Sequence, residues 1–515
     1  MCLVKIIKNN FHPKRISRNA DDHMPIYSGI FNELLDCLDD GEILYVNPIR
    51  GDDTTGKPSH GYSPFCTIQG ARDYAVLNGH TGATSLIYVE QGEYFAESLL
   101  TYNGNYYFEE GAVVEGFIGT HSPDTRESLF ATADTDITEM NVYGNGTFII
   151  PASLDSPTGG WSAQFFVNSI ASASFYFEYK KLTGYSAYLI EAGGIGAKVI
   201  MNVKEGIFSN QDPLSSNIPN YYTINLLGAS FILNTPTIIE QKVGTGSTCI
   251  ILRSFHGRET QLTIGELDVQ TAYEAIRVSE DSVTTYAFVP EVTINIRTLR
   301  GGYRGISVTD GWYEQVNWNF NIDNMYVVDV GIVASITDGA QGPVTINYNG
   351  NITSSGQRAL YIDNALPLSQ IIFNGVYKTE ADTEAVYLQA NTSDTKLIIN
   401  GTIITEGATA SAVRVIDTAD SFGTGGLGDV NIYSTGDSVS GTTTINCLGN
   451  VWMEQAPDAT TIFLGNYVLN LTSYVRQLFV HKAVYLDDVP SYDDEAAAVT
   501  GGLTTGRVYQ TTGSG

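Results

Sequence analysis

Val-Thr-Ile-Asn-Ile at residues 292–296 returns as Val-Asn-Trp-Asn-Phe at 316–320 and as Val-Thr-Ile-Asn-Tyr at 344–348. Apolar and polar residues alternate in each copy, which is the two-residue period of a strand with one buried face. Asn, Asp or Gly residues follow each copy, so we expect the strands to end there in turns.

An Asn-Gly pair recurs after an apolar residue, and its Asn stands at positions 349, 374 and 400. The steps are 374 − 349 = 25 and 400 − 374 = 26 residues. A period of this length, built from short strands and turns, is typical of a stacked array and suits one coil of a parallel β-helix. A single coil cannot bury its own apolar face, and stacking the coils gives a continuous core. The repeats therefore predict an all-β, single-stranded parallel β-helix, or solenoid.

The N-terminus differs in composition from the rest of the chain. Residues 1–20 contain five basic residues and no acid, whereas the whole chain has 27 basic and 56 acidic residues and a net charge of −29. A basic arm beside an acidic body predicts an attachment segment for another partner, and the alternative is a disordered terminus. Apolar residues at helical spacing over 27–38 predict a short helix, which would dock on the body or on its own copies.

The stretch that follows the arm carries a motif of turns, strands and one short helix. We expect strands at 43–46 and 86–89, a turn at 51–56, and a helix at 68–77 with Ala71, Tyr74 and Ala75 on its buried side. The motif comprises Tyr-Val-Asn at 45–47, Gly-Asp-Asp at 51–53, Pro-Phe at 64–65, Thr-Ile at 67–68, Ile-Tyr-Val at 87–89 and Gly-Glu-Tyr at 92–94. It resembles the opening of the pectate-lyase-like right-handed β-helix superfamily. The resemblance implies a right-handed coil whose helix caps the first open strand edge.

Both ends of the chain carry a second resemblance. Pro-Lys-Arg-Ile at 13–16, Asn-Ala-Asp-Asp-His at 19–23 and the tail ending Tyr-Gln-Thr-Thr-Gly at 509–513 are similar to the ends of tailed-bacteriophage fibre and spike proteins. We therefore divide the chain into a virion-attachment arm and helix at 1–41, a β-helix shaft at 42–480 with its capping start at 42–94, and a C-terminal phage-type segment at 481–515. The resemblance implies a virion protein that is made in the host cytoplasm and exposed on the particle.

Composition argues against several classes of function. A net charge of −29 argues against a nucleic-acid partner, because phosphate contacts require Lys and Arg. The five cysteines are scattered without CxxC spacing and the seven histidines are dispersed, so we expect neither a metal site nor a cofactor. No segment is long and apolar enough to span a bilayer, and the N-terminus does not resemble a signal peptide.

One set of residues suggests a catalytic site. An acid or Asn follows the second strand of successive coils, and we expect these residues to stack in one ladder: Glu280 or Asp281, Asp310, Asp338, Asp363, Asn391 and Asp417. Carboxylates one or two coils apart would match the spacing of a glycosidase pair, since strands stack about 4.8 Å apart. Asp310 and Asp338 are the candidate catalytic residues, and Trp312 and Tyr313 the candidate sugar platform. The alternative is that these acids only stabilise turns, because Asp and Asn bond to their own turn backbone. Trp312 and Trp318 could equally fill the core or an inter-subunit seam.

These features together predict a homotrimeric fibre or tail spike of a tailed phage. Its arm would bind other virion proteins, and its shaft would bind host-surface glycans. The alternative is a tailspike depolymerase that cleaves capsular or O-antigen polysaccharide, as a glycosidase or a lyase. A secreted cellular pectinase is disfavoured by the missing signal peptide and the phage-like tail.

Overall fold

The computed structural model describes the chain from residue 43 to residue 455 with gaps, and two short segments near the C-terminus. The described segments are 43–58, 63–82, 85–97, 100–116, 129–132, 137–150, 165–168, 173–184, 188–193, 196–210, 222–241, 248–253, 259–270, 273–279, 291–309, 316–335, 344–363, 370–381, 383, 385–390, 396–405, 413–417, 430–434, 444–446, 451–455, 491–492 and 510–511. The predicted arm at 1–41 and its helix lie outside the described residues. The chain divides into two units, residues 1–476 and 477–515.

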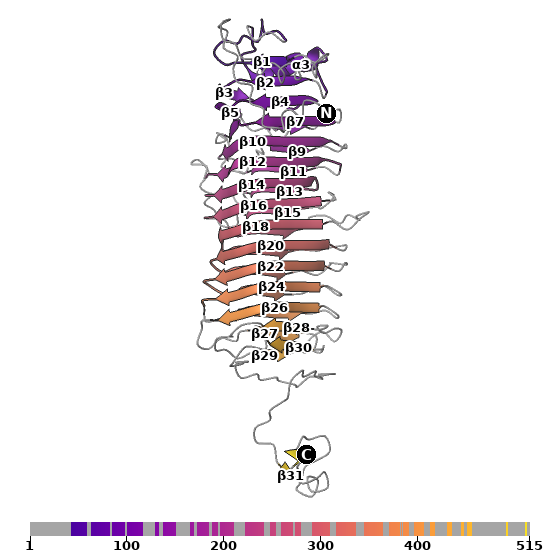
Figure 1. Cartoon of the computed structure of the whole chain (residues 1–515), viewed down its shortest axis with the longest axis vertical. Helices are drawn as coiled ribbons and strands as arrows, with labels where there is room; N and C mark the ends of the chain where they lie inside the picture. Colours follow the sequence, from indigo (N-terminus) through magenta and orange to yellow (C-terminus); the bar gives the residue numbers. More distant parts are fainter. Residues whose placement is uncertain are drawn as a thin grey trace, which may run out of the picture. The chain divides into compact units, whose positions relative to one another are not determined.

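The first unit is a parallel β-helix, in which every coil lies on the coil before it (Figure 1). Each coil has three legs. In the early coils the first leg is one strand and the second leg is another, whereas from β10 onward one long strand supplies both legs. The register shows this directly, because the first half of β10 pairs with β7 and the second half pairs with β8. The fold class expected from the sequence is confirmed, and its right-handedness stays a prediction.

The first two legs form one large sheet. The early first-leg strands are β1 (Ile43–Val46), β2 (Leu86–Val89), β4 (Gly104–Phe108) and β7 (Glu139–Gly144), and the early second-leg strands are β3 (Gly92–Glu97), β5 (Ala112–Gly116) and β8 (Thr147–Ile150). The long strands are β10 (Ser174–Gly184), β12 (Lys198–Ser209), β14 (Ser230–Glu240), β16 (Glu259–Val269), β18 (Glu291–Gly301), β20 (Val316–Val327), β22 (Val344–Ser354), β24 (Gln370–Thr379) and β26 (Lys396–Thr405), followed by the shorter β28 (Val430–Ser434) and β30 (Val451–Gln455).

The third leg forms the second sheet. Its strands are β6 (Phe130–Thr132), β9 (Phe165–Asn168), β11 (Tyr188–Gly193), β13 (Tyr222–Leu227), β15 (Thr248–Arg253), β17 (Glu274–Ser279), β19 (Arg304–Thr309), β21 (Val330–Ser335), β23 (Leu360–Asp363), β25 (Val386–Ala390), β27 (Val413–Asp417) and β29 (Thr444–Asn446). In the C-terminal unit, the structure describes one parallel pair, β31 (Ser491–Tyr492) with β32 (Gln510–Thr511).

The core runs inside the coils as columns of apolar side chains. One column contains Ile294, Phe320, Tyr348 and Phe373, which are backbone partners on successive strands and are all fully buried. Trp318 in the neighbouring column is also fully buried. Its ring therefore fills the core and does not lie at an inter-subunit seam, the two places that the sequence left open for this residue. Trp312 lies outside the described residues.

The repeated Asn-Gly pairs do not form turns, as the sequence suggested, but a corner inside a continuous strand. Asn349 and Gly350 lie within β22, and Asn374 and Gly375 lie within β24. Gly350 and Gly375 have φ angles of 136° and 146°, a region that favours glycine. A Cβ at Gly375 would overlap the carbonyl oxygen of Gly350 in the coil before it. Glycine thus lets each strand bend sharply between the first and second legs while it stays paired.

The capping start has the predicted elements. Strands β1 and β2 and the helix α3 (Ile68–Leu77) begin and end at the predicted residues. Ala71 and Ala75 are fully buried and Tyr74 packs partly buried against the core. Among the described residues, no helix has the length and apolar character needed to cross a membrane.

Replacing Phe373 with Asp should prevent folding of the shaft, because its ring lies between Tyr348 and Tyr377, with centroids 6.2 and 6.0 Å away. An unpaired carboxylate buried there costs several kcal/mol, and the lost ring adds a cavity. Circular dichroism during thermal melting would measure the effect. Val376→Asp is the matched control, since Val376 is exposed in the same strand and its substitution should change the melting temperature little. Equal melting of both variants would show that the assigned strand faces are reversed.

Gly375→Ala should destabilise the shaft by more than about 2 kcal/mol, because the new Cβ meets the backbone of Gly350 and the φ angle is unfavourable for alanine. Gly79→Ala separates the two causes. Gly79 also has a positive φ, 72°, but a Cβ there meets nothing within 4 Å. Urea unfolding should therefore show a clearly smaller loss for Gly79→Ala, and equal losses would mean that the corner contact is unimportant.

Candidate functional site

The candidate residues named from the sequence all lie outside the described residues: Asp310, Trp312, Tyr313 and Asp338. The structure describes the strands that lead to them, β19 and β21, which end at Thr309 and Ser335. No geometry therefore tests these four residues as a site.

The predicted acid ladder is wrong in register at the coil where it can be followed. Asp363 has Ser335 and Gln389 as backbone partners, not Asp338 and Asn391. One coil further on, Asp417 is the partner of Ala390. The prediction aligned the turns of successive coils, whereas the structure aligns their strands. Among the described members of the ladder, Asp363 and Asp417 therefore stand one register position apart and do not share a column.

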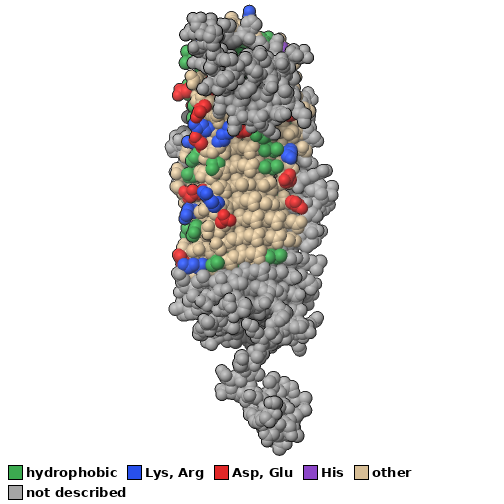
Figure 2. Space-filling view, in the orientation of Figure 1, with side chains coloured by type: hydrophobic (Ala, Val, Ile, Leu, Met, Phe, Trp, Pro, Cys, Tyr) green, Lys and Arg blue, Asp and Glu red, His purple; other side chains and the backbone are tan. Residues whose placement is uncertain are grey.

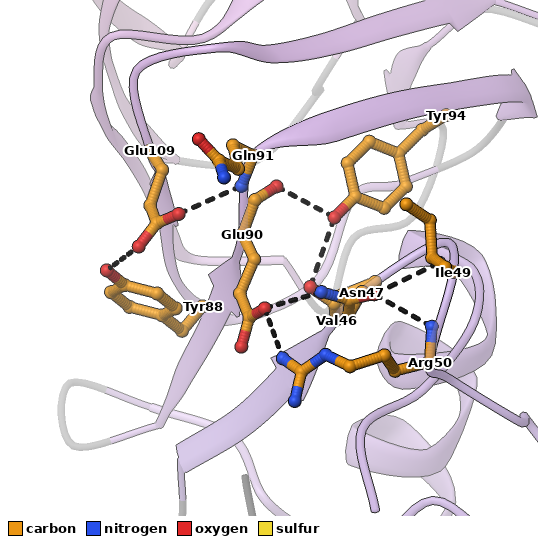
Figure 3. A network of polar contacts seen from close by, with 9 residues as sticks. All are labelled: Val46, Asn47, Ile49, Arg50, Tyr88, Glu90, Gln91, Tyr94 and Glu109. Carbon is orange, nitrogen blue, oxygen red and sulfur yellow. Dashed lines mark hydrogen bonds and ion pairs between the residues drawn. The ribbon is translucent and has the colours of Figure 1, made fainter. Parts of the chain in front are cut away.

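Carboxylates do gather at the N-terminal cap, but they hold the backbone in place (Figure 3). Glu90 forms an ion pair with Arg50 at 2.6 Å and accepts a hydrogen bond from the Asn47 amide. The Asn47 side-chain oxygen accepts hydrogen bonds from the backbone N–H groups of Ile49 and Arg50, at 3.0 and 2.8 Å. This network fixes the loop that leaves β1.

A second carboxylate in the same view joins two coils. Glu109 accepts a hydrogen bond from the Tyr88 hydroxyl at 2.6 Å and one from the backbone N–H of Gln91 at 2.9 Å. The Tyr94 hydroxyl lies 3.0 Å from the Val46 carbonyl oxygen and 2.8 Å from that of Glu90. These contacts account for the polar residues of the cap in terms of structure alone.

Two further carboxylates hold the start of α3. Asp53 accepts hydrogen bonds from the backbone N–H groups of Cys66 and Thr67 and from the Thr67 hydroxyl. The buried Glu97 accepts hydrogen bonds from the first backbone N–H groups of the helix, those of Ile68 and Gln69, both at 2.9 Å. Helix N-terminal N–H groups have no partner within the helix, so these acids complete the cap. Asp53 of the Gly-Asp-Asp motif therefore has a structural role.

The described surface has another cluster, at the corner where the second leg passes into the third. We call it the tyrosine–arginine row; its members are Tyr273, Tyr303, Arg304, Asp329, Arg358, Tyr361 and Tyr387. They stand at or near the start of the third-leg strands β17, β19, β21, β23 and β25. Strand stacking thus spaces the row over five coils, or about 20 Å.

Stacked tyrosines form the two ends of the row. Tyr273 and Tyr303 stack with ring centroids 5.0 Å apart, and the Arg304 guanidinium lies 4.9 Å from the Tyr273 ring. Tyr361 and Tyr387 stack at 5.3 Å, and the Arg358 guanidinium lies 4.6 Å from the Tyr387 ring. Each end therefore pairs flat aromatic faces with a guanidinium, which is a planar donor of hydrogen bonds.

Asp329 lies between the two ends and is 6% exposed. Burial raises its pKa, and contact with Tyr303 and the charges of Arg304 and Arg358 lower it in part. The charge of Asp329 in turn raises the pKa of the Tyr303 hydroxyl. These effects couple Asp329 electrostatically to Tyr303 and to the two guanidiniums.

Glu274 anchors the row from beneath and is also buried. It accepts a hydrogen bond from the Thr248 hydroxyl at 3.1 Å and lies 3.8 and 3.9 Å from the guanidiniums of Arg304 and Arg277. Counting these groups, three guanidiniums stand against the two carboxylates of Glu274 and Asp329. This count covers only the described side chains at the corner, in a chain whose net charge is −29.

This arrangement suits a ligand with apolar ring faces and polar edges. The C–H face of a sugar packs on an aromatic ring, while guanidinium N–H groups bond to hydroxyl or carboxylate oxygens. The Tyr303 side chain is the most open part of the row, at 40% exposed. Sequence analysis missed the row, although its tyrosines recur at the coil period, 303 − 273 = 30 and 387 − 361 = 26 residues apart.

Within the described residues, no group of three or more His, Cys, Asp or Glu side chains is arranged to hold a metal ion. Comparisons with family models, with curated proteins and with solved structures find no match to this chain.

Glu97 should make the stability of the cap depend on pH. Burial raises its pKa from 4.5 to about 7, so between these values the folded chain binds more protons than the unfolded chain. Stability should therefore fall as the pH rises through this window and then level off, by about 3 kcal/mol at most. Urea unfolding of the wild type and of Glu97→Gln from pH 5 to pH 8 would measure it. The variant should lose most of this slope, and an unchanged slope would assign the pH dependence to other groups.

Proposed function

We propose that this chain is the shaft of a tailed-phage virion fibre or spike that binds host-surface glycans through the tyrosine–arginine row. The single observation that carries the proposal is the row itself, with two tyrosine stacks and two guanidiniums over five consecutive coils. The phage-like ends of the sequence and the β-helix support it. The arm at 1–41 would bind other virion proteins, and the particle would carry the shaft as a homotrimer.

Binding fits the row better than cleavage does. A glycosidase of the common type needs two carboxyl groups flanking the scissile bond. The row contains Asp329, which is buried against Tyr303, and Glu274 beneath it, which is engaged by Thr248 and two guanidiniums. Neither carboxyl is placed to act on a ligand above the tyrosines. Depolymerase activity would have to come from acids such as Asp310 and Asp338, and it remains the alternative proposal.

The length of the tyrosine–arginine row also fits a polysaccharide. Tyr303 precedes Arg304, the partner of Val330, whereas Tyr361 is the partner of Val333, so the two tyrosine stacks lie four register positions apart along the strands. An extended glycan that meets both stacks would therefore cross the coils obliquely. Arginine and tyrosine are the residues that most often dominate binding energy at interfaces. A repeating ligand on a repeating surface needs no deep pocket, because each coil adds a further contact.

Tyr303→Ala should weaken glycan binding about tenfold or more, since loss of an aromatic stack costs about 1 to 2 kcal/mol. Binding would be measured on an array of purified capsular and O-antigen polysaccharides. Tyr326→Ala is the matched control, because Tyr326 is 41% exposed and lies 4.8 Å from Arg300 but stands outside the row. We expect Tyr326→Ala to bind with wild-type affinity and Tyr303→Ala to bind more weakly than both.

Chain length of the bound polysaccharide, followed by size-exclusion chromatography, separates binding from cleavage in the same samples. Stable chain length with Tyr303-dependent binding is the expected result. Shortening that Asp310→Asn or Asp338→Asn abolishes would instead favour the depolymerase. Binding that is equal in Tyr303→Ala and the wild type would overturn the row as the glycan site.

A further inference from the structure

The outer face of the first leg carries a surface that glycan binding does not use. We call it the neutral plateau and define it as two outward-facing residues in each of seven successive strands, from β12 to β24. Its members are Ile200 and Asn202, Ile232 and Asn234, Gln261 and Thr263, Thr293 and Asn295, Asn319 and Asn321, Asn347 and Asn349, and Ile372 and Asn374. All fourteen side chains are uncharged.

Asparagine ladders make the plateau rigid. Asn321 donates a hydrogen bond to the Asn295 side-chain oxygen at 2.9 Å, and Asn349 donates one to Asn321 at 2.7 Å. Asn374 continues this ladder onto Asn349 at 2.8 Å. In the parallel column, Asn347 donates to Asn319 at 3.0 Å. Each such bond uses one N–H of an amide that has two, so the ladder orders the side chains while leaving polar capacity that points outward.

Charge is kept off the plateau and placed around it. Figure 2 shows this face of the stacked coils with a broad area largely without charged or apolar side chains. Exposed charges border it at the first residue of three strands, Lys198, Glu259 and Glu291. Others lie beyond the corner on the second leg, where Lys180 and Glu205 form an ion pair at 3.4 Å. Protein–protein interfaces are depleted of charged residues at their centre and have a polar rim, and the plateau shares this depletion of charge.

We propose that the neutral plateau is the face by which copies of this chain pack side by side, about an axis parallel to the shaft. The charge of the chain is the reason to choose a second copy as the partner of this face. Two chains at −29 repel each other, so contact between them is least opposed at a face without charge. The plateau offers such a face over seven coils, about 30 Å of the shaft. Around a threefold axis, each plateau would face those of both neighbours.

The composition of the plateau also favours a protein partner over a glycan. It has no aromatic side chain on which a sugar ring could stack, whereas the tyrosine–arginine row on the third leg has four. Its ends carry apolar side chains at Ile200, Ile232 and Ile372, which lose water on contact with a partner. Between them, the ladder amides can bond across to those of a neighbouring copy at little entropic cost, because they are already ordered.

Mass in solution tests the proposal, through light scattering of the purified full-length chain in physiological salt. The wild type should have the mass of three chains, 3 × 55.8 = 167.4 kDa. The variant Asn319→Asp with Asn347→Asp adds six carboxylates around the axis of a trimer and should scatter as a folded monomer of 55.8 kDa.

The control makes the same chemical change on the same two strands beyond the corner. Asn324 and Asn351 also form a stacked pair, at 3.4 Å, but on the second leg. Asn324→Asp with Asn351→Asp should therefore remain a trimer. Circular dichroism melting would check that each variant is folded. If stacked carboxylates unfold the first variant, the single variants Asn347→Asp and Asn351→Asp are compared instead, and only Asn347→Asp should be monomeric.

A wild-type monomer, or a folded Asn347→Asp variant that stays trimeric, would overturn the proposal. Its failure is distinct from that of the glycan site. The monomeric variant keeps Tyr303 and Arg304, so it should still bind a short polysaccharide fragment with wild-type affinity. If a trimeric Tyr303→Ala variant bound the fragment as well as the wild type, the glycan site would be overturned and the plateau would not.

Discussion

In-register pairing between the strands of successive coils determines which neighbours each side chain of the shaft has. The strands are parallel and about 4.8 Å apart, so a residue lies directly over its equivalent in the coil before it. Inside the shaft this places Ile294, Phe320, Tyr348 and Phe373 in one apolar column. Outside, the same register brings Asn295, Asn321 and Asn349 within hydrogen-bonding distance. The same register therefore produces both the apolar columns of the core and the asparagine ladders of the surface.

The bend between the first and second legs is the condition that allows this register to persist. A strand that turns a corner while still paired brings its backbone against the carbonyl of the coil before it. At Gly350 a Cβ would overlap the Ile322 carbonyl oxygen, and at Gly375 it would overlap that of Gly350. The absence of a side chain, together with the positive φ, relieves this contact. The Asn that precedes each glycine then projects outward into the ladder, which explains why the two residues repeat as a pair.

Local signals in the sequence were sufficient for the fold and the cap. The 25- and 26-residue steps indicated coils, and the apolar spacing located α3, because a helix depends on neighbouring residues. The Asn-Gly pairs were misassigned as turns, since the same residues serve a turn or a corner and only pairing with another coil distinguishes them. The acid ladder was misaligned for a related reason. Successive coils differ in the lengths of their connections, as where the step from Leu397 to Val430 is 33 residues and the step from Val430 to Val451 is 21, so counting from turn to turn does not preserve strand register.

The candidate sites depended even more on contacts that the sequence does not display. Tyr273 and Tyr303 are ordinary tyrosines until stacking places their rings 5.0 Å apart, and Asp329 acquires a raised pKa only through burial beside them. The repeat period contained part of this information, because aromatic residues at a constant offset must stack once the coils do. What it lacked was the leg on which they stand and the direction in which they point.

The three legs of this strongly acidic shaft differ in how they arrange charged side chains. The second leg balances charge locally, as where Arg300 and Glu266 lie 3.7 Å apart, while the third leg gathers guanidiniums against tyrosines. The neutral plateau of the first leg carries no charge, and its asparagine amides stay ordered by bonding to one another. If copies pack through that leg, the charged legs face outward and their repulsion falls with distance and with salt. Each copy then presents its own tyrosine–arginine row to the surroundings. Weak contacts at three such rows would add through avidity, so assembly through the neutral leg and recognition through the third leg reinforce each other.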